Sequence, residues 1–214
     1  MSSSSTRKQA LVGWANNYAD FTSNVQHQKF LFFYECLSKI AGDEYEMDGL
    51  KGYRNGPVFS TVFSDNKYCA DFLAACGQNY PVLSGLVNIR RANLSMFLVK
   101  SLGNKLSEFT HGLNIWAAKK SEIEKGGYQV ALEESDFSEQ DASIFRDIEN
   151  AYTEGYVSSV DVLNINGKAF VYYKSDKNKL SDTVKDAIYE AAFDPEYDGP
   201  VYISFSDGGE LLLD

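Results

Sequence analysis

Residues 25–41 have the sequence VQHQKFLFFYECLSKIA, and residues 50–58 follow with LKGYRNGPV. The first stretch repeats its apolar residues three and four positions apart, which predicts an amphipathic helix. Pro57 fixes its own φ and biases the residue before it away from the helical region, so we expect an extended segment with a rigid corner over 50–63. The expected buried stripe of the helix consists of Phe30, Phe33, Tyr34, Leu37 and Ile40.

Helical spacing continues on both sides of this stretch. Gly42 is well placed to end the first helix, and Pro81 is expected to separate two later ones. Ser138 and Asp141 resemble a capping box, which predicts a helix start. The expected helices cover 8–21, 25–41, two parts of 67–103, 104–119 and 138–152.

The last part of the chain changes character. Asn166-Gly167 lies between two runs of β-forming residues and is a strong hairpin signal. A helix is expected over 181–193, and a second hairpin over 201–213. The predicted fold class is therefore α+β: a mainly helical part with a short extended Gly-Pro-Val segment, followed by a small acidic hairpin–helix–hairpin part. The expected divisions are a disordered tail (1–9), a helical domain (10–130) and an acidic α+β part (131–214).

The 214 residues carry a net charge of −10, and this charge is unevenly distributed. Residues 1–125 hold 14 basic and 11 acidic side chains, whereas residues 126–214 hold 6 and 19. A strongly acidic protein repels phosphate, so we expect no direct nucleic-acid binding. The excess negative charge belongs to the last 89 residues alone.

The cysteines and the apolar segments indicate the cellular compartment in which we expect the protein. The three cysteines form no CxxC pair and stand among apolar residues, so we expect buried thiols in a reducing cytoplasm. The first eight residues lack the apolar core of a signal peptide, and the run from Phe30 to Tyr34 is too short to span a bilayer. We expect a soluble cytoplasmic protein that does not bind membranes.

The sequence lacks the motifs of the common enzyme classes. There is no phosphate-binding loop, dinucleotide-binding glycine motif, HExxH or GxSxG. The acidic stretch 44–49 only loosely resembles a calcium loop, since Asn55 stands where a bidentate glutamate is needed. Residues 194–199 are acidic but have no nearby nucleophile. We therefore expect no catalysis, no metal and no cofactor.

Two separated motifs resemble the Panacea (SocA-like) antitoxin domain. Residues 28–33 (QKFLFF) and 50–58 (LKGYRNGPV) resemble the family's Leu-Gln-Lys-Leu-Leu-Tyr helix and its aromatic-basic-x-Gly-Pro-Val turn. Residues 106–111 (LSEFTH), with Trp116 five positions later, are similar to the family's closing motif, Leu-Ser-x-x-Thr-His followed by Trp. The resemblance covers roughly residues 10–120.

The resemblance implies a helical antitoxin that binds a protein toxin directly, or that presents the toxin to a protease as an adaptor. The residue types in its motifs allow two interpretations. They stabilise the fold, with Trp116 as an anchor and His111 at the negative end of a helix dipole. Alternatively they contact the partner, because Tyr, Trp and Arg are frequent interface hot spots. The candidate partner-binding residues of the motifs are Tyr53, Arg54, Pro57, His111 and Trp116.

The acidic part suggests three interpretations. Glu133, Glu134 and Asp136 begin it and are expected to steer and hold a basic toxin. Alternatively, a phage or mobile-element protein uses such charge to mimic nucleic acid and occupy a host defence protein. The third interpretation is that an acidic surface only keeps the protein dispersed.

Overall fold

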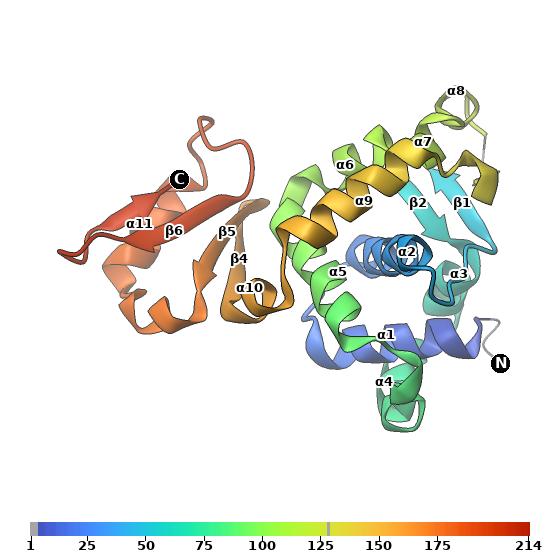
Figure 1. The fold of residues 1–214 in the computed structure, drawn as a ribbon, viewed down its shortest axis with the longest axis horizontal. Coiled ribbons are helices and arrows are strands. Elements are labelled where there is room, and N and C mark those ends of the chain that lie inside the picture. Colours follow the sequence, from blue (N-terminus) through green and yellow to red (C-terminus); the bar gives the residue numbers. More distant parts are fainter. Residues whose placement is uncertain (1–3, 128) are drawn as a thin grey trace.

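The computed structural model describes residues 4–127 and 129–214, which form two units side by side (Figure 1). The larger, N-terminal unit surrounds one central helix, and the smaller unit is a four-stranded sheet with one helix. The helices of the larger unit are α1 (Thr6–Tyr18), α2 (Asn24–Ala41), α3 (Ser60–Tyr68), α4 (Phe72–Leu83), α5 (Ile89–Leu102), α6 (Leu106–Gly112), α7 (Asn114–Ala117), α8 (Lys120–Glu124), α9 (Glu139–Ala151) and α10 (Glu154–Ser159). Short 3₁₀ turns cover Ser84–Leu86, Gly103–Lys105, Glu134–Asp136 and, in the smaller unit, Lys174–Lys179.

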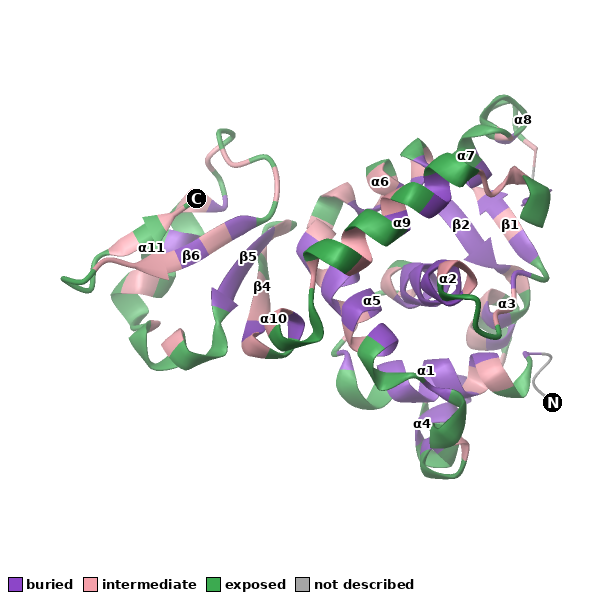
Figure 2. Cartoon of the chain, in the orientation of Figure 1, coloured by how far each residue is buried: buried purple, intermediate pink, exposed green. Residues whose placement is uncertain are grey.

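Helix α2 is the centre of the larger unit (Figure 2). Ser23 and Gln26 form a capping box at its start, and Gly42 ends it at a φ of +71°, as predicted. The helix is buried on every side from residue 27 to residue 38, so the prediction of a single buried stripe is too narrow. Its buried Glu35 is paired with Arg7 at 3.0 Å and with Lys8, both on α1.

The extended segment is a hairpin. Strand β1 (Leu50–Tyr53) pairs antiparallel with β2 (Gly56–Phe59), and β3 (Val130–Ala131) pairs with the other edge of β1. The backbone N–H of Phe59 donates to Gln28 Oε1 at 2.8 Å, which fixes β2 against α2. The predicted corner at Pro57 is therefore the start of a buried strand that lies on the central helix.

The prediction that Pro81 separates two helices is wrong. Pro81 lies inside α4, and the break comes later, before the N-cap residue Asn88 of α5. A proline deprives the carbonyl four residues earlier of its helical hydrogen bond. Here Asn17 on α1 donates its Nδ2 to the Gly77 oxygen at 3.1 Å, so the helix continues through the proline.

The predicted tail over 1–9 is wrong from residue 4 onward, and residues 1–3 lie outside the described part. Helix α1 begins at Thr6 because Ser5 accepts a hydrogen bond from the Lys8 backbone. Ser4 is also fixed, since its Oγ donates to Asp65 at 2.6 Å.

Helix α9 begins at the predicted capping box of Ser138 and Asp141, but it belongs to the larger unit, so the domain boundary lies later than predicted. Phe145 is fully buried, with its ring 6.4 Å from that of Phe32 and 6.1 Å from that of Phe33 on α2. Residues 131–159 thus belong to the larger unit rather than to an acidic C-terminal part, because the apolar stripe of α9 covers the central helix.

The smaller unit confirms both hairpins and the helix between them. Its strands follow the order β4-β5-β6-β7, and β5 and β6 run parallel. Asn166 and Gly167 have the positive φ values, 51° and 79°, of a tight hairpin turn. The elements are β4 (Val160–Ile165), β5 (Lys168–Tyr173), α11 (Asp182–Ala191), β6 (Val201–Phe205) and β7 (Leu211–Leu213).

The two units have separate cores that meet along α5. The core of the smaller unit lies between its sheet and α11, whereas Val171 on the other face of β5 joins the core of the larger unit. Asn104 donates its backbone N–H to the Gly167 oxygen at 2.7 Å, and Lys105 pairs with Asp198 at 2.7 Å. These contacts hold the sheet against the end of α5.

The cysteine prediction is partly confirmed. Cys36 and Cys76 are buried free thiols, whereas Cys69 is half-buried. Burial raises the pKa of Cys76 to about 11, so this thiol stays protonated at neutral pH. Within the described residues, no helix combines the length and the apolar character that crossing a bilayer requires.

Candidate functional site

The two motifs converge on the glycine of the β1–β2 hairpin. Lys29 on α2 is only 1 % exposed, and its Nζ donates to the Pro57 oxygen at 3.3 Å. Gly56 has a φ of +98°, and a Cβ at this position would lie 2.2 Å from Lys29 Nζ and 2.5 Å from Thr110 Oγ1. Only glycine leaves room for both atoms, so Lys29, the hairpin and α6 meet at this point.

Trp116 and His111 form the other side of the cluster. Their rings stack with centroids 3.9 Å apart at an interplanar angle of 17°. Trp116 is 2 % exposed, and its Nε1 donates to the Tyr53 oxygen at 3.0 Å. The indole therefore anchors α7 to the end of β1, which is the structural role that the sequence allowed for it.

His111 is half-buried, and α6 ends one residue later, as expected. Burial lowers the pKa of His111, and the positive charges of Lys29 and Lys120 lower it further, against a hydrogen bond to the Arg54 backbone. The imidazole is thus neutral at physiological pH. The expected benefit of a charged histidine at the helix end is outweighed by burial and by the neighbouring lysines.

Two cavities flank the cluster and share Arg54. One, of about 180 Å³, lies between the first turn of α2, the hairpin and α3. The other, of about 590 Å³, lies between the hairpin, α6 and α8, and His111, Trp116 and Lys120 line it. Arg54 is exposed, and no ion pair links it to a carboxylate among the described residues.

The acidic candidates lie at the other end of β1. Leu132 bonds to the backbone of Leu50, so the following residues are separated from Tyr53 by the length of that strand. Glu134 accepts hydrogen bonds from Lys39 and Tyr45, and these bonds lower its pKa.

The other two acidic candidates differ in their freedom. Asp136 pairs with Lys119 at 3.4 Å and accepts from the Glu133 N–H at 3.0 Å. Its carboxylate is therefore already used within the fold, whereas Glu133 is exposed. The structure brings the five motif residues together but places the acidic trio elsewhere.

Three side chains that hold or line the candidate site have no role at that site in the sequence-based prediction. Lys29 and Gln28 belong to a motif whose pattern assigns neither of them a role, although a lysine directly before an apolar run is a usable signal. The spacing of Asp141 from Ser138 predicts only a helix cap. Its Oδ1 also accepts from the Asn114 N–H at 2.6 Å and its Oδ2 from the Ile115 N–H at 3.0 Å, which positions α7.

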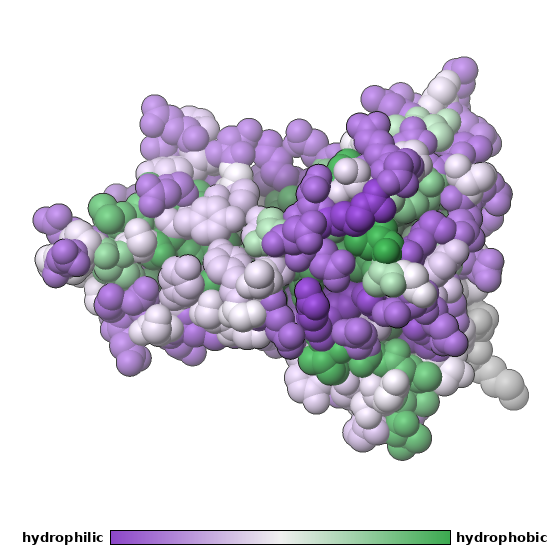
Figure 3. Space-filling model, in the orientation of Figure 1, coloured by the Kyte–Doolittle hydropathy of each residue, from purple (hydrophilic) through white to green (hydrophobic). Residues whose placement is uncertain are grey.

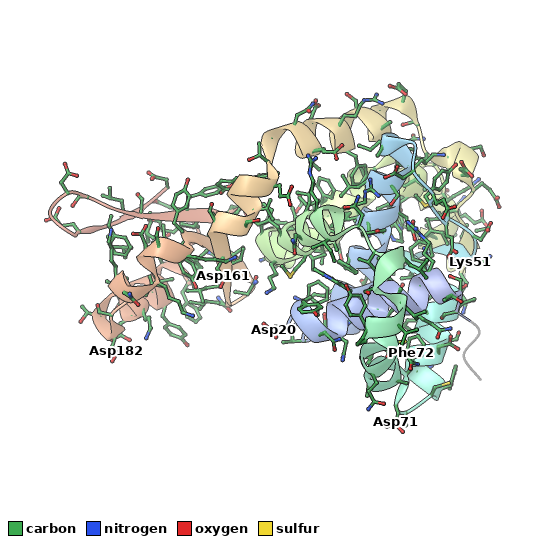
Figure 4. The ribbon with its side chains drawn as sticks, turned by 60° about the horizontal axis from the view of Figure 1, so that its bottom comes forward. Asp20, Lys51, Asp71, Phe72, Asp161 and Asp182 are labelled. Atoms are coloured by element: carbon green, nitrogen blue, oxygen red, sulfur yellow. The ribbon has the colours of Figure 1, made fainter. Side chains whose placement is uncertain are left out.

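Among the residues that the structure describes, there is no group of three His, Cys, Asp or Glu side chains placed to hold a metal ion. Figure 4 shows Asp161 and Asp182 on the smaller unit, well away from Lys51 on β1. Comparison with protein-family models, with curated proteins and with solved structures finds no match for the chain.

Proposed function

We propose that the chain is an antitoxin of a bacterial or phage toxin–antitoxin system that neutralises its cognate toxin by direct binding. One observation carries this proposal. The two motifs that resemble the Panacea domain are separated in sequence by 48 positions, from Val58 to Leu106, yet they form one cluster around Gly56. Such convergence is expected when both motifs serve one binding surface.

Some of the motif residues are accessible to a partner, and the others are buried and stabilise the fold around them. Arg54 and the half-buried His111 line the 590 Å³ cavity and are accessible to a partner. Pro57 and Trp116 are buried, so their role is to hold the hairpin and α7 in position. We therefore assign partner contact to Arg54, His111 and Tyr53, and support to the other two.

The acidic surface is the second part of the proposal. Residues 126–159 contain eight acidic and one basic side chains, and Figure 3 shows hydrophilic groups along α9. Glu133, Glu139 and Asp147 are exposed there, which suits the attraction of a basic toxin. In an adaptor, one unit would hold the toxin and the other a protease, and the two separate cores support this arrangement.

Co-expression tests the proposal. The product of the adjacent gene should stop growth, and this chain should restore growth through a complex that co-purifies. Arg54→Glu should weaken the complex at least tenfold, whereas Arg90→Glu, an exposed arginine on α5, should not. If no neighbouring product is toxic, the proposed antitoxin function is refuted. If Arg54→Glu and Arg90→Glu neutralise the toxin equally well, the proposed binding surface is refuted.

The acidic α9 surface also favours one alternative, in which the protein occupies a host defence protein by mimicking nucleic acid. Reversing Glu133, Glu139 and Asp147 to lysine separates the two. An antitoxin held by the motif cluster keeps part of its affinity in this variant. A mimic loses its partner altogether, and nucleic acid competes with the wild-type complex.

A further inference from the structure

The smaller cavity beside the motif cluster has features that the proposed function does not use. It lies on the other side of the β1–β2 turn from His111 and Trp116, between the start of α2 and the start of α3. Its walls are largely apolar, formed by Val25, Val58, Phe63 and the ring of Tyr53. A volume of about 180 Å³ suits a small ring or one side chain.

The start of an 18-residue helix lines this cavity. Asn24, Val25 and Gln28 of α2 face it, and Ser23 caps only the Gln26 N–H. The N-terminal end of a helix carries partial positive charge and favours anions. A helix end alone does not make a site, so the neighbouring side chains must decide what binds.

Gln28 supplies the first independent sign of a ligand. The residue is 2 % exposed, and its Oε1 is held by the Phe59 N–H at 2.8 Å. That bond fixes the orientation of the amide, because an oxygen must face the N–H. Its Nε2 then lies on the opposite side of the group, buried and without a hydrogen-bond partner among the described residues. A buried donor without a partner is unfavourable and marks a place for an acceptor.

Lys29 supplies the second sign. Its side chain lines the cavity, and no carboxylate of the described part of the chain lies within ion-pair distance of its Nζ. Burial without an opposing charge lowers the pKa of Lys29 to about 7. Arg54 stands at the same cavity, also without a carboxylate partner in that part of the chain. The cavity therefore combines several donors and positive charges with no anion to balance them.

We propose that this cavity binds a carboxylate carried on a small apolar or aromatic body. The carboxylate accepts from Gln28 Nε2 and neutralises Lys29, and the apolar body packs on Val58 and Phe63. Asn24 also lines the cavity, and its Oδ1 is buried without a partner in the described chain. Rotation of this amide by 180° turns its Nδ2 donor toward the same carboxylate.

Benzoate and benzamide are a matched pair of probes, alike in size and different in charge. In a chemical-shift titration of the full chain, benzoate should bind with a dissociation constant on the order of 1 mM. Benzamide should bind at least tenfold more weakly, because it replaces one acceptor by a donor and carries no charge. Equal affinities for the two probes, or no binding of benzoate, would overturn the proposal.

Two variants locate the effect. Lys29→Met removes the buried amine and should lower the affinity for benzoate at least tenfold. Gln28→Glu keeps the acceptor for the Phe59 N–H and places a carboxylate inside the cavity, so it should abolish benzoate binding while the protein stays folded. Lys51→Met on β1 and Gln78→Glu on α4 change charge outside the cavity and should bind benzoate like the wild type. Undiminished binding in Gln28→Glu would refute the site even if Lys29→Met failed to fold.

The carboxylate has two possible sources, a free small acid or an acidic side chain of a protein partner. Acetate and propionate copy the side chains of Asp and Glu, so binding of these two at the affinity of benzoate indicates a side chain. Preference for benzoate by tenfold or more indicates a free aromatic acid. Because the titrations use this chain alone, their result stands whether or not the antitoxin proposal survives co-expression.

Discussion

Replacing Lys29 with Met should change how the stability of the protein depends on pH. Lys29 is 1 % exposed, and burial lowers its pKa from the ordinary 10.5 to about 7. In the unfolded chain the same amine has its ordinary pKa. Between the two values the unfolded state binds a proton that the folded state does not, so stability rises with pH from about 7 to about 10.5.

The size of the effect follows from the two pKa values. One pKa unit corresponds to about 1.4 kcal/mol, so the full difference amounts to about 5 kcal/mol of penalty below pH 7. Between pH 7.5 and pH 9.5, linkage gives the wild type a gain of about 2.5 kcal/mol from this group. Lys29→Met has no amine to titrate at this position, so its free energy of unfolding should lack this rise between pH 7.5 and pH 9.5.

Urea unfolding at pH 7.5, 8.5 and 9.5 measures the difference. Other groups that titrate in this range are present in both proteins, so their contribution cancels in the comparison. Lys51→Met, which removes a lysine from β1, should follow the wild type and serves as the control. Parallel stability curves for the wild type and Lys29→Met would show that the buried amine keeps its proton, and would refute the reasoning.

Three further substitutions test the cluster, each by urea unfolding. Gly56→Ala should lower the free energy of unfolding by about 3 kcal/mol, because of the positive φ and the clash with Lys29 and Thr110. Gly112→Ala has open space around the added methyl group and should lower it by less than about 1 kcal/mol, and equal losses in the two variants would contradict the close approach at Gly56. Trp116→Phe loses the bond to the Tyr53 oxygen and should cost about 1–2 kcal/mol, and an unchanged midpoint would show that this bond contributes nothing. Asp141→Asn exchanges a buried acceptor for a donor and should lower the free energy of unfolding by about 2–3 kcal/mol. The control Asp147→Asn, at an exposed position, should change it little, and similar losses in both variants would argue against the link between α7 and α9.

Elements with local signals could be predicted from the sequence. The Asn166-Gly167 turn needs positive φ at both positions, and few residues other than Asn and Gly accept it. The start of α9 follows from Ser138 and Asp141, which bond to each other across one helical turn. In both cases the determining contacts lie within four residues, so the sequence contains them directly.

Elements that depend on distant partners could not be predicted. Helix α4 continues through Pro81 because Asn17, 64 residues earlier, replaces the missing hydrogen bond of Gly77. The place of α9 in the larger unit depends on the contact of Phe145 with Phe32 and Phe33. Neither the spacing of apolar residues nor the composition indicates these two contacts, so the sequence predicts the domain boundary too early.

The candidate site shows the same division. The motif residues could be named because their order resembled a family pattern, but their exposure could not. Trp116 suited an interface hot spot by residue type, yet its indole is enclosed beneath His111. Lysine is a residue type that is almost never fully buried unless paired, yet Lys29 lies beneath the hairpin because Gly56 has no side chain to exclude it. Burial is a property of the packed fold, and residue type alone does not determine it.

Under the proposed function, the distribution of charge suits a partner that carries both signs. The acidic excess is shared between residues 126–159 and residues 160–214, where eleven acidic side chains face five basic ones. The two cavities of the motif cluster carry more basic than acidic side chains, because Lys29, Arg54 and Lys120 line them against one carboxylate, Glu124, which pairs with Lys120 at 3.8 Å. A toxin that is only basic would be attracted by α9 and repelled by the cluster. In our proposal, the exposed acids govern the rate of association, and the buried donors govern the rate of dissociation. Charge reversal on α9 should therefore slow the formation of the complex, whereas Gln28→Glu should speed its decay if the partner supplies the carboxylate.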